Sequence, residues 1–184
     1  MPGMGNGMRL SPAAGLGSWA SFTAMGDQAM VMGDTVVFQD EVDAAMDAAF
    51  AHGLSVTGLH NHFFYDQPKV YFMHLGGEGS PTQLAAGVKA VWDAVKAVRA
   101  AHPQPAQGFG GATPSPGKLS AASIATIIGH PAPVTDGVAK VTIARKGQMH
   151  GQAIGASMGV DHLGRIQQQR RSGFHRRRFH HARR

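Results

Sequence analysis

The feature that most constrains the fold is a long helical pattern over residues 80–101. It opens with Ser80-Pro81-Thr82-Gln83, the composition of a capping box with proline at the first helical position. Apolar residues then recur at helical spacing, at Leu84, Val88, Val91, Trp92, Val95 and Val98. Because such a helix carries one apolar face, we expect it to pack on a sheet.

The segments before this helix predict that sheet. Strands are predicted over 18–24, 28–38, 55–63 and 69–75, with a turn or a kink inside the second strand at Gly33-Asp34. A helix is predicted between the second and third strands, with Asp40 as its N-cap and Gly53 at its end. The predicted fold class is α+β, an antiparallel sheet with packed helices in a β-β-α-β-β-α unit.

Three histidines, His60, His62 and His74, lie in the two strands of the second predicted hairpin. Alternate residues of a strand share a face, so His60 and His62 lie together. An odd-length loop would bring His74 to the same face, and an even-length loop would place it on the opposite face. Three convergent imidazoles are typical of a catalytic zinc site, and two histidines with a carboxylate also suit iron. Glu78, just past the second strand, is the predicted carboxylate ligand or general base.

A structural role for these histidines stays open beside the metal hypothesis. They could be buried side chains that hydrogen-bond to the backbone or to Asn61, or they could bind an anionic ligand. Both faces of the hairpin are rich in apolar residues, so we expect the imidazoles to be desolvated. Desolvation lowers the pKa of an imidazole and keeps it in the neutral form that ligates metals.

The basic charge is concentrated at one end of the chain. Residues 1–164 hold nine basic and eleven acidic residues, whereas residues 165–184 hold eight arginines and no acid. An arginine-rich tail binds phosphate backbones through charge alone, so specific nucleic-acid recognition is not expected. There is no cysteine, and no apolar run reaches the roughly 18 residues that a membrane span needs. The start of the chain lacks the apolar core of a signal peptide.

The composition predicts three further segments after the first unit, which covers residues 1–101. Residues 102–117 form a proline- and glycine-rich linker. Residues 118–160 predict a short helix, then a strand over 137–145, then a stretch, "GQMHGQAIGASMGV", that is similar to the opening "GMRLSPAAGLG". We interpret this similarity as an internal repeat whose first copy lacks its start and whose second copy is cut short. Residues 161–184 are predicted to be a disordered, aberrant tail.

A single-base frameshift would explain that tail. Removing one cytosine from permitted codons for residues 161–166 changes their translation to DTWAAF, and continuing in that frame gives a sequence that aligns without a gap to the segment beginning "GSWASF". The hypothesis explains the missing acids and the broken repeat together. We therefore predict that residues from about 162 onward are translated out of frame.

The sequence resembles a known bacterial family. The stretches "GLGSWASF", "VMGDTVVFQDEV" and above all "LHNHF" followed by "FMH" resemble the LppY/LpqO family, a duplicated domain of unknown function. The resemblance covers about residues 7–160. It implies two copies of the module and, for full-length relatives, export or attachment to the envelope, but it implies no activity.

Two classes of function therefore remain open. One is a protein that binds a divalent metal, zinc or iron, through His60, His62, His74 and Glu78, with or without catalysis. The other is a non-catalytic envelope or ligand-binding module in which the histidines are structural and the small-molecule ligand is unknown. Because strand edges of an incomplete second unit would be exposed, we also expect self-association.

Overall fold

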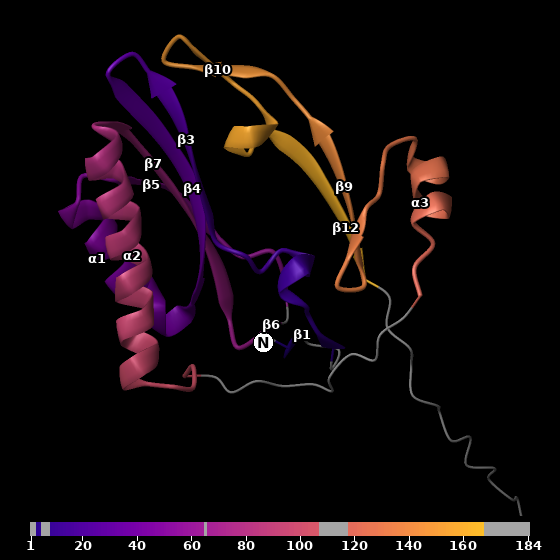
Figure 1. Ribbon diagram of the computed structural model, residues 1–184. Coiled ribbons are helices and arrows are strands. Elements are labelled where there is room, and N and C mark those ends of the chain that lie inside the picture. Colours follow the sequence, from indigo (N-terminus) through magenta and orange to yellow (C-terminus); the bar gives the residue numbers. More distant parts are fainter. Residues whose placement is uncertain (1–2, 5–7, 65, 107–117, 168–184) are drawn as a thin grey trace, which may run out of the picture.

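The computed structural model describes residues 3–4, 8–64, 66–106 and 118–167, and the side chains of 3–4, 8–9 and 161–167 are outside this description. The described residues up to 106 are called the first region, and those from 118 onward the second region. The first region holds a four-stranded antiparallel sheet in the order β3-β4-β7-β5 (Figure 1). These strands are β3 (Trp19–Met25), β4 (Gln28–Phe38), β5 (Ser55–His60) and β7 (Val70–Gly79). Two helices, α1 (Val42–Ala51) and α2 (Pro81–Ala101), cover one face of the sheet. The predicted α+β class and the β-β-α-β-β-α order are confirmed.

The main core lies between this sheet and the two helices. Side chains on one face of β4 and β7, including Val31, Val37 and Met73, pack against Val88 and Val91 of α2. Trp92 Nε1 donates a hydrogen bond of 3.1 Å to Thr35 Oγ1 and so ties α2 to the centre of β4. Because successive side chains of a strand point to opposite faces, the alternate residues of β4 and β7 point away from the helices.

Three local predictions for this region are wrong. Segment 28–38 is one continuous strand with no turn at Gly33-Asp34. Glycine stands at position 33 because a Cβ there would come within 2.9 Å of the carbonyl oxygen of Trp19 on the adjacent strand. Asp40 is not an N-cap, since it lies in a short 3-10 helix, η2 (Gln39–Glu41), where the Glu41 carboxylate accepts from the Phe38 amide. Ser80 precedes α2 as predicted, but its side chain makes no capping hydrogen bond.

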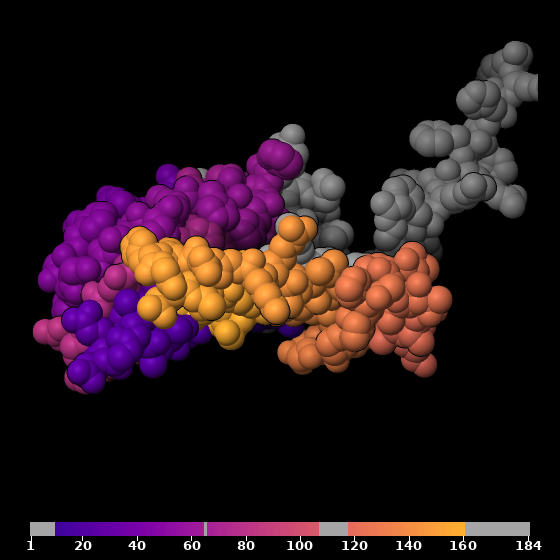
Figure 2. All heavy atoms as spheres, turned by 90° about the horizontal axis from the view of Figure 1, so that it is seen from above, coloured from indigo at the N-terminus to yellow at the C-terminus, as the bar shows by residue number. Residues whose placement is uncertain are grey.

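The second region lies over the other face of the sheet. It comprises α3 (Ala121–Ile128), β8 (Val134–Thr135), β9 (Val138–Ala144), the hairpin of β10 (Gly147–Met149) and β11 (Gln152–Ile154), the 3-10 helix η3 (Ala156–Met158) and β12 (Asp161–Gln167). The first seven residues of the predicted disordered tail thus form a strand, and residues 168–184 lie outside the described chain. Strands β12, β9 and β8 form a three-stranded antiparallel sheet. Figure 2 shows the orange and yellow atoms of this region lying against the indigo and purple atoms of the first region.

Short elements near the start of the chain complete the fold. Strands β1 (Gly3–Met4), β2 (Met8–Arg9) and β6 (Asp66–Gln67) form a small sheet in the order β2-β1-β6. The 3-10 helix η1 (Pro12–Ala14) follows β2 and contacts β9 and β12. None of the helices in the described ranges is both long and apolar enough to cross a membrane.

Candidate functional site

Two of the three predicted histidines meet on the face of the sheet that points away from the helices. His60 in β5 lies opposite Phe72 in β7, and His74 lies opposite Gly58, so the two histidines are diagonal neighbours on one face. Their Nε2 atoms are 2.7 Å apart, a hydrogen-bond distance in which one ring donates and the other accepts. Gly58 makes room for this pair, since a Cβ at position 58 would come within 3.2 Å of the His74 ring. The sequence-based condition that His74 shares the face of His60 is therefore met.

His62 lies beyond the end of β5 but stays next to the pair. Strand β5 is shorter than predicted and ends at His60. The His62 ring stacks on Phe72 with centroids 3.7 Å apart, and its centroid is 5.0 Å from that of His60. His60 and His62 are exposed and His74 is half-buried, so the expected desolvation of all three rings is wrong. Apolar neighbours in the sequence did not predict burial, because β5 is an end strand of the sheet and, in the described part of the chain, its outer side has no neighbouring strand.

Glu78 does not join the histidines. Strand β7 runs to Gly79, so Glu78 lies inside the strand, four residues or about 13 Å along it from His74. Its carboxylate contacts Nδ1 of His150, which lies in the turn between β10 and β11. In the described residues, no group of three or more His, Asp or Glu side chains is placed to hold a metal ion.

A cavity of about 830 Å³ opens over the histidine face, between the two regions. His62, Phe72 and His74 line it from the first sheet. Residues of η1, the segment before β3 and η3 line it from the opposite side, together with Lys140 of β9. A volume of this size is in the range of small-molecule sites, which often lie between domains or layers.

A row of three side chains crosses the floor of this cavity. Trp19 of β3 lies opposite Asp34 of β4, and Asp34 lies opposite His74 of β7. Asp34 is 9% exposed, so a carboxylate lies at the floor of the cavity beside an indole and an imidazole. Sequence reasoning treated Asp34 as a turn residue. The signal that could have identified it is an acidic residue in the middle of an otherwise apolar eleven-residue strand.

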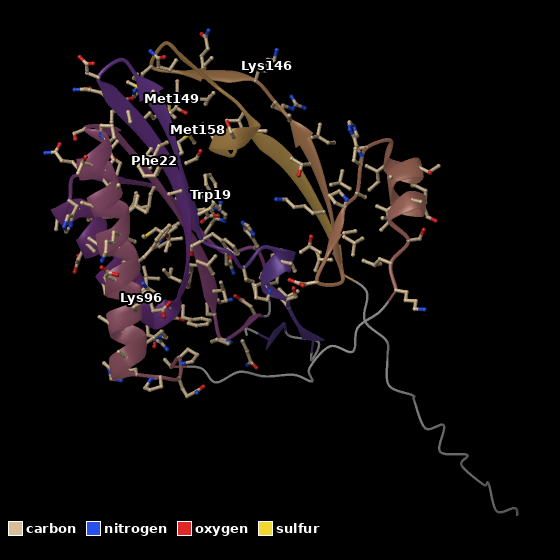
Figure 3. All side chains as sticks on the ribbon, in the orientation of Figure 1. Trp19, Phe22, Lys96, Lys146, Met149 and Met158 are labelled. Atoms are coloured by element: carbon tan, nitrogen blue, oxygen red, sulfur yellow. The ribbon has the colours of Figure 1, made fainter. Side chains whose placement is uncertain are left out.

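Trp19 joins the two regions across the cavity (Figure 3). A Cβ at Gly159, which follows η3, would lie 2.7 Å from Cη2 of the Trp19 ring. Gly159 also has a φ of +76°, a left-handed conformation that favours glycine. The absence of a side chain at position 159 thus lets η3 approach the indole, and both residues line the cavity.

The carboxyl groups with shifted pKa values lie in the helical layer, away from the cavity. Burial raises the pKa of Glu41, although the Phe38 amide and the Arg99 guanidinium partly oppose this effect. Hydrogen bonding to Lys89 lowers the pKa of Asp93, which is exposed on α2. Glu41 Oε1 lies 2.6 Å from Nε of Arg99, so this pair fixes α2 to the start of α1. These pKa shifts come from contacts that hold the helical layer together and do not mark a site in the cavity.

Comparison with known proteins identifies the family of the first region. A model described as Domain of Unknown Function (DUF1259) matches residues 3–94, which is half of the chain and includes the whole histidine face. The chain belongs to the DUF1259 family. Searches of curated proteins and of solved structures gave no match. The DUF1259 match ends inside α2, so Lys140 and η3 lie outside the matched residues.

Proposed function

We propose that this DUF1259 protein binds a small molecule in the cavity between its two regions. The observation that carries the proposal is the cavity itself, about 830 Å³, into which both regions project polar and aromatic side chains. Trp19 offers a ring surface, while Asp34, His62, His74 and Lys140 offer charged and hydrogen-bonding groups. Polar groups that converge on one space are what fixes the orientation of a small molecule in a pocket.

Trp19 provides a direct reporter for this proposal. The chain has two tryptophans, and Trp92 is on the helix side of the sheet, so Trp92→Phe leaves Trp19 as the only indole. We expect a fragment collection to contain compounds that change Trp19 emission saturably and compete with one another. A collection that leaves the emission of the folded protein unchanged throughout would overturn the proposal.

Metal binding is a second candidate, and it rests on the close approach of two imidazole nitrogens. Zinc binds histidine nitrogens at about 2.0–2.1 Å, so two such ligands around a tetrahedral ion lie about 3.4 Å apart. The Nε2 atoms of His60 and His74 are 2.7 Å apart, so small ring rotations would admit an ion between them. His62 is near enough to supply a third ligand by swinging off Phe72.

Metal analysis of the purified protein separates the two candidates. Stoichiometric zinc or iron that disappears in a His60→Ala/His62→Ala variant supports the second candidate. His150→Ala is the matched control, because His150 is exposed and contacts Glu78 on another part of β7. Metal-free wild-type protein that takes up no zinc on titration would remove metal binding from consideration.

We also propose that the two regions are copies of an LppY/LpqO-like module. The helices η1 and η3 start 144 residues apart, and each is preceded by a short antiparallel strand pair and followed by a left-handed glycine. Strands β3 and β12 follow at nearly the same separation. This order supports the repeat inferred from the sequence, whereas the proposed frameshift near residue 162 rests on the codon comparison alone. Sequencing the gene tests the frameshift: the idea fails if no single-base change restores the repeat.

Self-association is a related proposal. In the described part of the chain, β3 and β5 are the end strands of the four-stranded sheet, and β12 and β8 are those of the three-stranded sheet. End strands present backbone donors and acceptors that pair with other chains. Sedimentation analysis should therefore find dimers or larger species, and a strictly monomeric sample at all concentrations would contradict this.

A further inference from the structure

The cavity receives two opposite formal charges from opposite walls. Asp34 comes from the centre of the first sheet, and Lys140 comes from β9 in the second region. Of the described residues that line the cavity, these are the one carboxylate and the one lysine or arginine. A ligand with a single charge would meet a like charge on one wall, which costs binding free energy in a partly enclosed space.

The wall at Asp34 suits a cationic group. Trp19 is the cross-strand partner of Asp34, so an indole lies beside the carboxylate. The Trp19 side chain is about one-third exposed in the open cavity, which leaves ring surface for a ligand. An ammonium group placed here would gain both a charge-assisted hydrogen bond and a contact with the ring, the two interactions that recognise ammonium groups in proteins.

The wall at Lys140 suits an anionic group. Lys140 is exposed on β9, and its ammonium group is free to reach into the cavity from the second region. His62 and His74 lie on the opposite wall and offer ring nitrogens for hydrogen bonds to the same anion. Ser157 of η3 adds a hydroxyl on the side of the second region.

We infer that the ligand is a small zwitterion with an apolar or aromatic body, such as an amino acid or a short peptide. Its ammonium group contacts Asp34 and Trp19, and its carboxylate contacts Lys140. Its body lies against the ring of Trp19, because Phe72 is 1% exposed and is covered by the stacked His62 ring. This inference rests on the proposed function, because it names the ligand class of the same cavity.

Three compounds with one ring system test the two charges separately. Phenylalanine carries both charges, phenethylamine carries only the ammonium group, and 3-phenylpropionate carries only the carboxylate. Each is titrated into Trp92→Phe protein while Trp19 emission is followed. Because each analogue lacks one charge-assisted contact, phenylalanine should bind about 10-fold or more tightly than either analogue.

Variants at the two walls assign each charge. Lys140→Ala should abolish the preference for phenylalanine over phenethylamine and should not weaken phenethylamine binding, since the amine loses no charged contact and no longer meets a like charge. Asp34→Asn should abolish the preference over 3-phenylpropionate. Lys146→Ala is the matched control, because Lys146 lies after β9 and outside the cavity lining (Figure 3). Unfolding midpoints show whether Asp34→Asn folds, and Lys140→Ala tests the inference independently.

The outcomes separate the ligand class from the proposed function. A tight phenylalanine complex whose preference disappears in Lys140→Ala and persists in Lys146→Ala supports the inference. Equal affinities for the three compounds, or an unchanged preference in Lys140→Ala, would overturn the inference. Fragments that bind while phenylalanine does not would also overturn it and leave the cavity as a binding site. Unchanged Trp19 emission with every compound would overturn both proposals.

Discussion

In the first region, two helices cover one face of the sheet, and the second region lies over the other face. The two regions are packed very differently. The first region buries a continuous apolar core between β4, β7 and the helices. In the second region, α3 lies to the outer side of β9 and β12 (Figure 1). It has no buried residue, and Ile127 on it is 84% exposed. The burial there is concentrated in β9 and at Met158, next to the first region. We conclude that the first region supplies most of the stability and that the second region mainly closes the cavity.

The largest expected contrast between the regions is in core truncation. Met73→Ala removes a fully buried side chain of β7 and should lower the free energy of unfolding by about 2–5 kcal/mol, because it leaves a cavity. Ile127→Ala in α3 should change it by less than about 0.5 kcal/mol. Urea unfolding followed by circular dichroism measures both. Equal losses would show that the two regions share one core.

Disrupting the contact between Trp19 and Gly159 should lower the free energy of unfolding by less than Met73→Ala does. Gly159→Ala forces a left-handed alanine, which costs about 1–2 kcal/mol, and also pushes a methyl group into the indole. Gly151→Ala has nearly the same φ, +79°, but nothing within 4 Å of its Cβ, so it is the matched control. Both variants should lose stability, and only Gly159→Ala should shift Trp19 emission in Trp92→Phe protein. The same emission shift in both would contradict the contact.

Glu41 gives the first region a distinctive pH dependence. Burial raises the pKa of Glu41 in the folded state above its ordinary value of 4.5, so the folded protein holds this proton more tightly than the unfolded chain. Its contribution to stability is therefore greatest below pH 4.5 and falls as the pH rises through the folded pKa. Glu41→Gln cannot titrate, so the stability of wild type relative to this variant should decrease with rising pH in that window. A difference that stays constant with pH would contradict the raised pKa.

The smallest expected effect is at the contact between His150 and Glu78. This pair joins the β10–β11 turn to β7, but both side chains are exposed, and exposed ion pairs contribute about 0–1 kcal/mol. His150→Ala should lower the free energy of unfolding by about 0.5 kcal/mol or less. Hydrogen exchange should show faster opening of β10 and β11 alone. A global destabilisation as large as that of Met73→Ala would mean that the hairpin is part of the core.

Elements with a strong local pattern were predictable from the sequence. Helix α2 extends over residues 81–101, as predicted, because the apolar spacing and the proline at the first position both indicate the same helix. Strand β9 lies within the predicted 137–145. Gly33-Asp34 was misread because a turn dipeptide is a local signal, whereas close packing against Trp19 is a tertiary cause. The diagonal pairing of His60 with His74 was predicted only conditionally, since the register of a hairpin depends on the loop and on a bulge between Val56 and Gly58.

The cavity itself could not be predicted from the sequence. Trp19 and Asp34 already pair across the β3–β4 hairpin, but Lys140 is more than 100 residues further along the chain, and only the packing of the second region on the first brings it to the same space. The sequence pattern identified the histidines because they are close together in a hairpin. It gave no comparable signal for a partner that lies more than 60 residues away, such as Lys140 relative to His74.

The central claim is that both regions contact one ligand, and chemical-shift mapping tests it most directly. Isotope-labelled protein is titrated with phenylalanine while the Trp19 indole, the His74 imidazole and the Gly159 amide are followed by NMR. We predict saturable changes with one dissociation constant at all three positions, and none at Ile127. Changes confined to one region, or no saturable change at any of the three positions, would contradict the account.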